Sequence, residues 1–151
     1  MMDGWLGVAE VLAALVVLLV LALVLLALRR RWLDRQGGTF ECSLRLRATT
    51  PGSGWALGVG RYSEDLLEWF RFFSFAWWAR KSFPRPEVRV LDTRDPDPVE
   101  AVALYADQRI VRFEVVVGGR TEQWELAMSP DALTGLLSWL EAAPPGLSRR
   151  P

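Results

Sequence analysis

The chain has 151 residues, with equal numbers of basic and acidic side chains and a formal net charge of zero. That length is enough for one domain and a membrane anchor. After residue 36 the chain carries 14 Lys and Arg against 15 Asp and Glu, which argues against a nucleic-acid-binding protein, because such proteins carry a basic face. Histidine is absent and Cys42 is the one cysteine, so an internal disulfide, a thiolate metal cluster and the commonest general base are excluded.

An unbroken run of 18 Val, Leu and Ala residues occupies positions 11–28. As a helix this run is about 27 Å long, close to the hydrocarbon thickness of a bilayer. A helix that is apolar on every side needs burial all round, which a domain of about 115 residues does not provide. We therefore expect a transmembrane helix at residues 11–28, preceded by a short extracytoplasmic segment at residues 1–10.

The residues that flank the apolar run predict its orientation. Four arginines lie within seven residues of its end: Arg29, Arg30, Arg31 and Arg35. The positive-inside rule places such a cluster in the cytoplasm. A cleaved signal peptide fits poorly, because the first ten residues contain Asp3 and Glu10 but no Lys or Arg, and the run exceeds a typical signal h-region. We expect a single-pass cell-membrane protein with its N-terminus outside and its C-terminal domain in the cytoplasm.

Two tryptophans and a short linker complete the expected anchor. Trp5 and Trp32 flank the apolar run, where Trp commonly sits at the level of the lipid headgroups. Residues 29–38 form the expected basic juxtamembrane linker, which ends in Gly37-Gly38. Such a short linker keeps the following domain within about one domain diameter of the membrane.

Residues 39–143 have the pattern of a mainly β domain. Phe40, Cys42, Leu44 and Leu46 alternate with polar residues, which is typical of a half-buried strand. Further strands are expected at residues 55–62, 66–75 (one strand or two), 88–91, 101–106, 109–117 and 121–128. The last three would form two hairpins that turn at residues 107–108 and at Gly118-Gly119.

One amphipathic helix is expected after the last strand. Ser129 is its N-cap and Pro130 its first residue. Its apolar stripe follows helical spacing: Leu133, Leu136, Leu137 and Leu140, flanked by Trp139. Residues 144–146 (PPG) end the helix, and residues 144–151 are expected to be a disordered tail.

About seven short strands followed by one amphipathic helix predict a bent antiparallel sheet. In the expected arrangement the sheet forms a partly open barrel that the helix closes, with its leucines inward, which resembles the pleckstrin-homology-like fold. That analogy concerns the fold and carries no function. The alternative is an open sheet with the helix on one face.

Three segments resemble a known family: residues 54–62 (GWALGVGRY), 125–128 (ELAM) and 137–145 (LSWLEAAPP). With the N-terminal apolar run, they resemble an actinobacterial family of small single-pass membrane proteins of unknown function. The resemblance implies the topology and fold described above. It also implies genes that often lie beside those of ATP synthase, and hence a membrane-protein partner in that neighbourhood. The family has no catalytic residues that could be carried over.

No local cluster has a catalytic or metal-binding pattern. Asp92, Asp95 and Asp97 are interrupted by prolines and lack the ligand number and turn glycine of a calcium loop, so we expect a solvated turn. Cys42 lies on the apolar face of the first strand, and we expect a buried hydrophobe. The glycine pairs at 52/54 and 58/60 do not open a helix after a strand, and we expect loop and packing roles. We therefore expect no enzyme, no cofactor and no metal.

Residues 69–83 contain eight aromatic residues in fifteen. Two interpretations remain open: ordinary core with an exposed loop, or a membrane or partner surface in which aromatic and basic residues are combined. The second interpretation assigns six residues to the surface: Trp77, Trp78, Arg80, Lys81, Phe83 and Arg85.

Together these patterns predict a membrane-anchored, non-enzymatic interaction module. Its primary interpretation is an adaptor or accessory subunit of a membrane complex. The alternative is a domain that senses lipid headgroups through the aromatic and basic loop.

Overall fold

The structure, a computed structural model, describes residues 2–35, 37–47, 50, 52–105 and 107–142. The chain forms two compact units. The first contains Met1–Gly37 and Phe73–Trp77, and the second contains Gly38–Phe72 and Trp78–Pro151. The expected tail, residues 144–151, lies outside the described residues.

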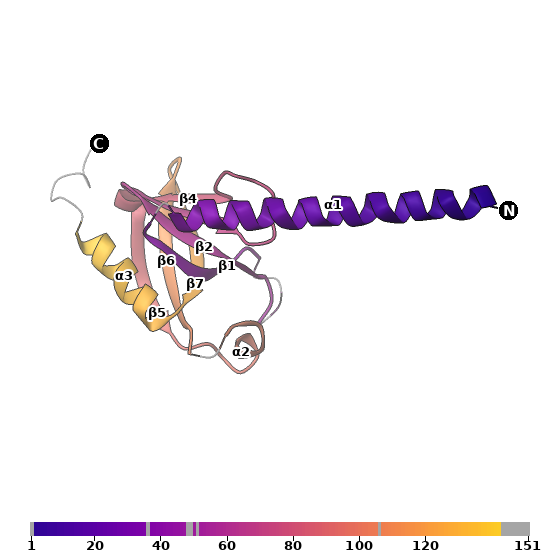
Figure 1. Ribbon diagram of the computed structural model, residues 1–151. Helices are drawn as coiled ribbons and strands as arrows, with labels where there is room; N and C mark the ends of the chain where they lie inside the picture. The colour runs from indigo at the N-terminus through magenta and orange to yellow at the C-terminus, as the bar shows by residue number, and fades with distance from the viewer. Residues whose placement is uncertain (1, 36, 48–49, 51, 106, 143–151) are drawn as a thin grey trace. The chain divides into compact units, whose positions relative to one another are not determined.

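A single long helix, α1 (Met2–Arg35), makes up most of the first unit (Figure 1). Within it, Trp5–Trp32 is long and apolar enough to cross a membrane, and nearly all its large apolar side chains are exposed. The helix continues past the apolar run as far as Arg35, because Arg and Leu are good helix formers. It ends before Gly37, whose φ of 68° is incompatible with a right-handed helix. Most of the expected linker is therefore helical.

The second unit contains one antiparallel sheet of seven strands. These are β1 (Thr39–Arg45), β2 (Trp55–Ser63), β3 (Leu66–Arg71), β4 (Lys81–Pro84), β5 (Val88–Arg94), β6 (Arg109–Val117) and β7 (Arg120–Met128). Their order is β4-β3-β2-β1-β7-β6-β5. The first strand is therefore central and pairs with both β2 and β7, as its alternating apolar residues favour.

Two expected strands are wrong in whole or in part. The expected strand at residues 66–75 ends at Arg71, and the Ser74 hydroxyl then accepts a hydrogen bond from the Ala76 amide in a turn. The expected strand at residues 101–106 is also wrong, because residues 101–103 belong to a short helix, α2 (Glu100–Ala103). The last residue of that expected strand, Ala106, lies outside the described residues. A carboxylate oxygen of Asp97 accepts hydrogen bonds from the amides that begin this helix, which favours a helical turn over a strand.

The sheet is strongly bent but is not closed into a barrel. The Phe83 ring on β4 meets the Phe113 ring on β6 edge-on at 5.2 Å, although four strands separate β4 from β6 in the sheet order. Strands β4 and β5 nevertheless remain the two edges. The sheet stays open at β4 because this strand has only four residues and is followed directly by a 3-10 turn, Arg85–Glu87. The second unit is therefore a bent, open antiparallel sheet followed by a C-terminal helix.

The closing helix, α3 (Pro130–Glu141), confirms the expected cap and most of the expected stripe, although Leu137 is half-buried and is not part of the main core cluster. The Ser129 hydroxyl accepts a hydrogen bond from the Ala132 amide at 3.2 Å. Leu136 is 2% exposed in the main core, and Leu133, Leu140 and other α3 residues pack against it. A smaller cluster of Leu104, Ile110 and Ala127, with Trp55 beside it, forms separately from the main core.

Glycines at 58 and 60 permit close packing across β2. A Cβ atom on Gly58 would overlap the Trp69 indole, and one on Gly60 would overlap the Phe40 ring. These contacts confirm the packing roles that the sequence predicts for this pair.

Candidate functional site

The structure divides the aromatic and basic surface expected at residues 77–85. Phe83 is 3% exposed and belongs to the main core, so its assignment to a surface is wrong. The reason is that Lys81–Pro84 forms a strand, in which alternate side chains face the core. Arg85 also turns inward, where its guanidinium lies 3.7 Å from the Asp65 carboxylate and over the Trp139 ring.

The remaining members of that surface belong to different units. Trp77 is 46% exposed in the first unit, whereas Trp78 is 73% exposed in the second. Arg80 is exposed, and Lys81 is half-buried with its ammonium 4.5 Å from the centre of the Trp124 ring. Of the six residues assigned to the expected surface, Arg80 and Lys81 therefore form a basic face on the second unit.

Arg80 and Lys81 line a hollow of about 480 Å³ in the second unit, here called the basic groove. Its cations are Arg47, Arg71, Arg80 and Lys81, and its apolar lining includes Leu46, Trp55, Ala56 and Trp124. Arg47 and Arg71 are not among the six residues that the sequence assigned to this surface; Arg47 follows β1, and Arg71 is the last residue of β3. Aromatic faces and unneutralised cations in one concave surface suit a ligand that carries both negative charge and apolar surface.

Strand register brings these residues together. Arg71 ends β3, and the amide of Arg80 donates to the carbonyl oxygen of Trp69 at 2.8 Å as the chain returns along β4. The amide of Leu46 donates to the carbonyl oxygen of Gly54 at 2.8 Å across the connection from β1 to β2. Gly54 has a φ of 86°, and a Cβ there would overlap the carbonyl of Arg47. Glycine at 54 therefore allows Arg47 to approach closely, and both residues line the groove.

Charge pairing distinguishes the groove from the rest of the domain. Seven arginines of the second unit lie within 4.0 Å of a carboxylate: Arg45, Arg61, Arg85, Arg89, Arg94, Arg109 and Arg112. Among the described residues of this unit, five cations have no such partner: Arg47, Arg71, Arg80, Lys81 and Arg120. All of these except Arg120 line the basic groove. The groove thus concentrates the positive charge that the domain leaves unneutralised.

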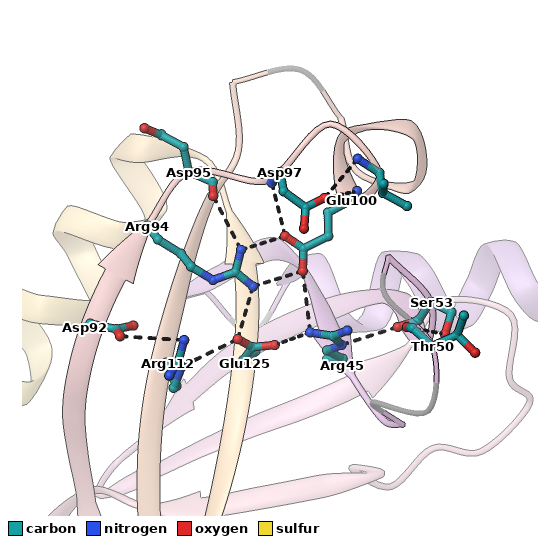
Figure 2. A network of polar contacts seen from close by, with 11 residues as sticks. Arg45, Thr50, Ser53, Asp92, Arg94, Asp95, Asp97, Glu100, Arg112 and Glu125 are labelled. Carbon is teal, nitrogen blue, oxygen red and sulfur yellow. Dashed lines mark hydrogen bonds and ion pairs between the residues drawn. The ribbon is translucent and has the colours of Figure 1, made fainter.

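A separate cluster of ion pairs positions α2 (Figure 2). The carboxylate of Glu100 is 2% exposed and accepts two hydrogen bonds from Arg94, at 2.6 and 2.9 Å. The amide of Asp97 donates to the same carboxylate at 3.2 Å. Hydrogen bonds from Arg94 outweigh burial and lower the pKa of Glu100. A buried carboxylate with this many donors is satisfied, so the cluster holds the α2 turn in place.

Glu125 joins this cluster to the sheet. Its carboxylate accepts from Arg45 at 2.7 Å and from Arg94 at 3.1 Å, and it lies 3.6 Å from Arg112. Burial favours a higher pKa for Glu125, but hydrogen bonds from Arg45 and Arg94 leave it below its usual value. No short-range pattern in the sequence links Glu125 to partners up to 80 residues away.

The acidic residues at 92–97 contribute to this region in different ways. Asp92 lies 3.7 Å from Arg112, Asp95 lies 2.8 Å from Arg109, and the Asp97 carboxylate accepts from the amides of Val99 and Glu100. Within the described ranges, no three His, Cys, Asp or Glu side chains are grouped so that they could hold a metal ion. Cys42 is buried, as expected, and burial raises the pKa of its thiol to about 12, so the thiol is protonated at neutral pH and is a poor nucleophile.

The residues expected to set the orientation of the anchor lie on α1. Arg30, Arg31 and Arg35 are exposed. Arg29 is 5% exposed and donates from Nε to the carbonyl oxygen of Ala76 at 2.7 Å. Trp5 is exposed near the start of the helix, and the ring of Trp32 meets that of Trp77 edge-on at 5.7 Å. Arg29 and Trp32, at the end of the apolar run, thus contact residues 73–77.

Residues 16–146 match a family described as a protein of unknown function, DUF2550, and the chain belongs to that family. An uncharacterized protein of Mycobacterium tuberculosis, Rv1312, is 32% identical over 143 residues, which are 94% of this chain and 97% of the relative. An uncharacterized protein of Mycobacterium leprae, ML1147, is 29% identical over 143 residues, with the same coverage. The match includes both the second half of the apolar helix and the sheet.

Proposed function

We propose that the protein is a membrane-anchored, non-enzymatic interaction module. In this proposal α1 spans the cell membrane with its N-terminus outside, and the second unit lies in the cytoplasm. The length and exposed apolar side chains of Trp5–Trp32 support the span, and the arginines at its C-terminal end support the orientation. The strand order and closing helix support a pleckstrin-homology-like fold for the second unit.

The basic groove is the proposed binding surface, and its partner is an acidic segment of another membrane protein. The observation that carries this proposal is that four of the domain's unpaired cations line one hollow. Arginine forks bind carboxylates in two-point contacts, while Trp55 and Trp124 offer apolar area beside them. This combination fits a peptide in which acidic and apolar residues alternate. The protein would then be an adaptor or accessory subunit, and the ATP synthase neighbourhood implied by the family resemblance is one source of such a partner.

Recognition of lipid headgroups is the second candidate function, and the same groove favours it. Arg47, Arg71, Arg80 and Lys81 could meet lipid phosphates, since each basic residue near an anionic surface contributes about 1 kcal/mol. A domain held at the membrane by α1 needs little intrinsic affinity, because the effective concentration of lipid is high.

Photo-crosslinking in intact cells distinguishes the two functions. A photo-reactive amino acid replaces Arg71 in the full-length protein. The matched control places it at Arg120, which lies outside the groove and, among the described residues of the second unit, has no carboxylate within 4.0 Å. We expect a discrete protein adduct from position 71 that is absent from position 120 and is lost when Arg47 and Arg80 are both changed to Glu. Adducts with lipid alone at position 71 would favour the headgroup reader. Identical adducts from both positions would contradict a role for the groove.

A further inference from the structure

We infer that Phe73–Trp77 is a second membrane contact, which places the rings of Phe73 and Phe75 among lipid headgroups and upper acyl chains beside the end of α1. This inference rests on the proposed membrane span. It concerns a surface of the first unit and is independent of the basic groove.

Two contacts fix the depth of this segment relative to the helix. Arg29 donates from Nε to the carbonyl oxygen of Ala76 at 2.7 Å, and the rings of Trp32 and Trp77 meet at 5.7 Å with an interplanar angle of 72°. Both contacts lie within one compact unit. Arg29 is the residue directly after the apolar run of 11–28, so the segment lies at the level where the hydrocarbon core ends and the headgroup region begins.

The exposed side chains of the segment suit that depth. Phe73 is 84% exposed, Phe75 59% and Trp77 46%, whereas Ser74 and Ala76 between them are half-buried. The exposed residues are all aromatic, and large exposed aromatic side chains in one short segment favour contact with an apolar phase over contact with water. Trp and Phe rings are typical of segments that lie in the interface of a bilayer.

The backbone and charge of the unit are compatible with the same environment. The Ala76 amide donates to the Ser74 hydroxyl at 3.2 Å and the Ala76 carbonyl accepts from Arg29, so both polar groups of this residue are satisfied internally, as low-dielectric surroundings require. Exposed Arg31 and Arg35 on the same helix end favour anionic headgroups around the segment. A loop inserted here would restrict rotation of the chain about the span.

Nitroxide labelling of the full-length protein in vesicles of phosphatidylcholine and phosphatidylglycerol tests the inference. A label is attached at Phe73→Cys, and its collisions with oxygen, which concentrates in lipid, are compared with those of a water-soluble nickel chelate. The controls are Leu18→Cys within the span and Val102→Cys, which replaces a residue that is 88% exposed in the second unit. Native Cys42 is buried, and unmodified protein measures its background labelling.

We expect the ratio of oxygen to nickel collisions at position 73 to exceed that at position 102 several-fold. The ratio should fall when Phe75→Ser is added, because the segment loses one of its inserted rings. A ratio at 73 equal to that at 102, with position 18 in lipid, would overturn the second contact and leave the span intact. Nickel access at position 18 would instead overturn the proposed span, and with it this inference.

Discussion

Replacing Glu100 by Gln tests the role of the buried ion-pair cluster in the stability of the domain. The carboxylate accepts two hydrogen bonds from Arg94, at 2.6 and 2.9 Å, and is 2% exposed. The amide of Gln is neutral and keeps only one acceptor oxygen. One of the two hydrogen bonds from Arg94 is therefore lost, and the remaining bond is weaker because its acceptor no longer carries a charge. Removing one member of a buried ion pair costs about 3–5 kcal/mol. Arg94 is 29% exposed and keeps Glu125 as a partner, so we expect the lower value of about 2–3 kcal/mol.

Thermal unfolding of the full-length protein in detergent, followed by near-ultraviolet circular dichroism, measures this loss. For a domain of about 115 residues, each kcal/mol lowers Tm by about 3–5 °C, so we expect a decrease of roughly 6–15 °C. The matched control is Glu114→Gln, which makes the same chemical change in a pair whose arginine, Arg89, is 79% exposed. That pair should contribute at most about 1 kcal/mol.

The pH dependence of the effect follows from the lowered pKa of Glu100. A carboxylate with a lower pKa in the folded state stabilises the fold fully above its unfolded pKa, near 4.5, and that contribution is lost as pH falls through the folded value. The difference in Tm between wild type and Glu100→Gln should therefore be constant near neutral pH and shrink below about pH 4.5. An unchanged Tm at pH 7, or a difference equal to that of the control, would refute the stabilising role of the cluster.

Three further predictions concern the anchor, the closing helix and the buried thiol. A membrane-impermeant thiol reagent should label Asp3→Cys but not Val102→Cys in intact cells, and the opposite pattern would refute the cytoplasmic domain. Leu136→Ala, which truncates a side chain only 2% exposed, should lower stability by about 2–5 kcal/mol in the same melting assay; an unchanged melt would show that α3 does not close the core. Native Cys42, whose thiol has a pKa of about 12, should react with thiol reagents at pH 8 only after denaturant is added, and rapid reaction of the folded protein would contradict its burial.

Several features of this protein are determined by signals that lie within a few residues of one another. The apolar run at 11–28 predicts a helix that can span a membrane, because length and composition alone decide that property. Ser129 and Pro130 begin α3 as expected, since a cap is a contact between neighbours. The turn at Gly118-Gly119 is present between β6 and β7, where positive φ angles at both positions require glycine-like freedom.

Other features depend on tertiary structure because their partners are far apart in the chain. Residues 101–103 are helical rather than extended, because the Asp97 carboxylate accepts from the Val99 and Glu100 amides and because Arg94 and Arg45 hold Glu100 in the interior. Phe83 lies in the core because the chain returns beside β3 as a fourth strand. Neither outcome has a signal in a short window of sequence, where Phe83 is one aromatic residue among many.

The basic groove also emerges only when the sheet is assembled. The second unit carries nearly equal numbers of basic and acidic residues, so its composition predicts no charged surface. The fold pairs most arginines with carboxylates and leaves Arg47, Arg71, Arg80 and Lys81 around one hollow. Sequence composition determines how much charge the chain carries, whereas strand order and register decide which charges are neutralised, because electrostatic attraction depends on distances through space rather than along the chain.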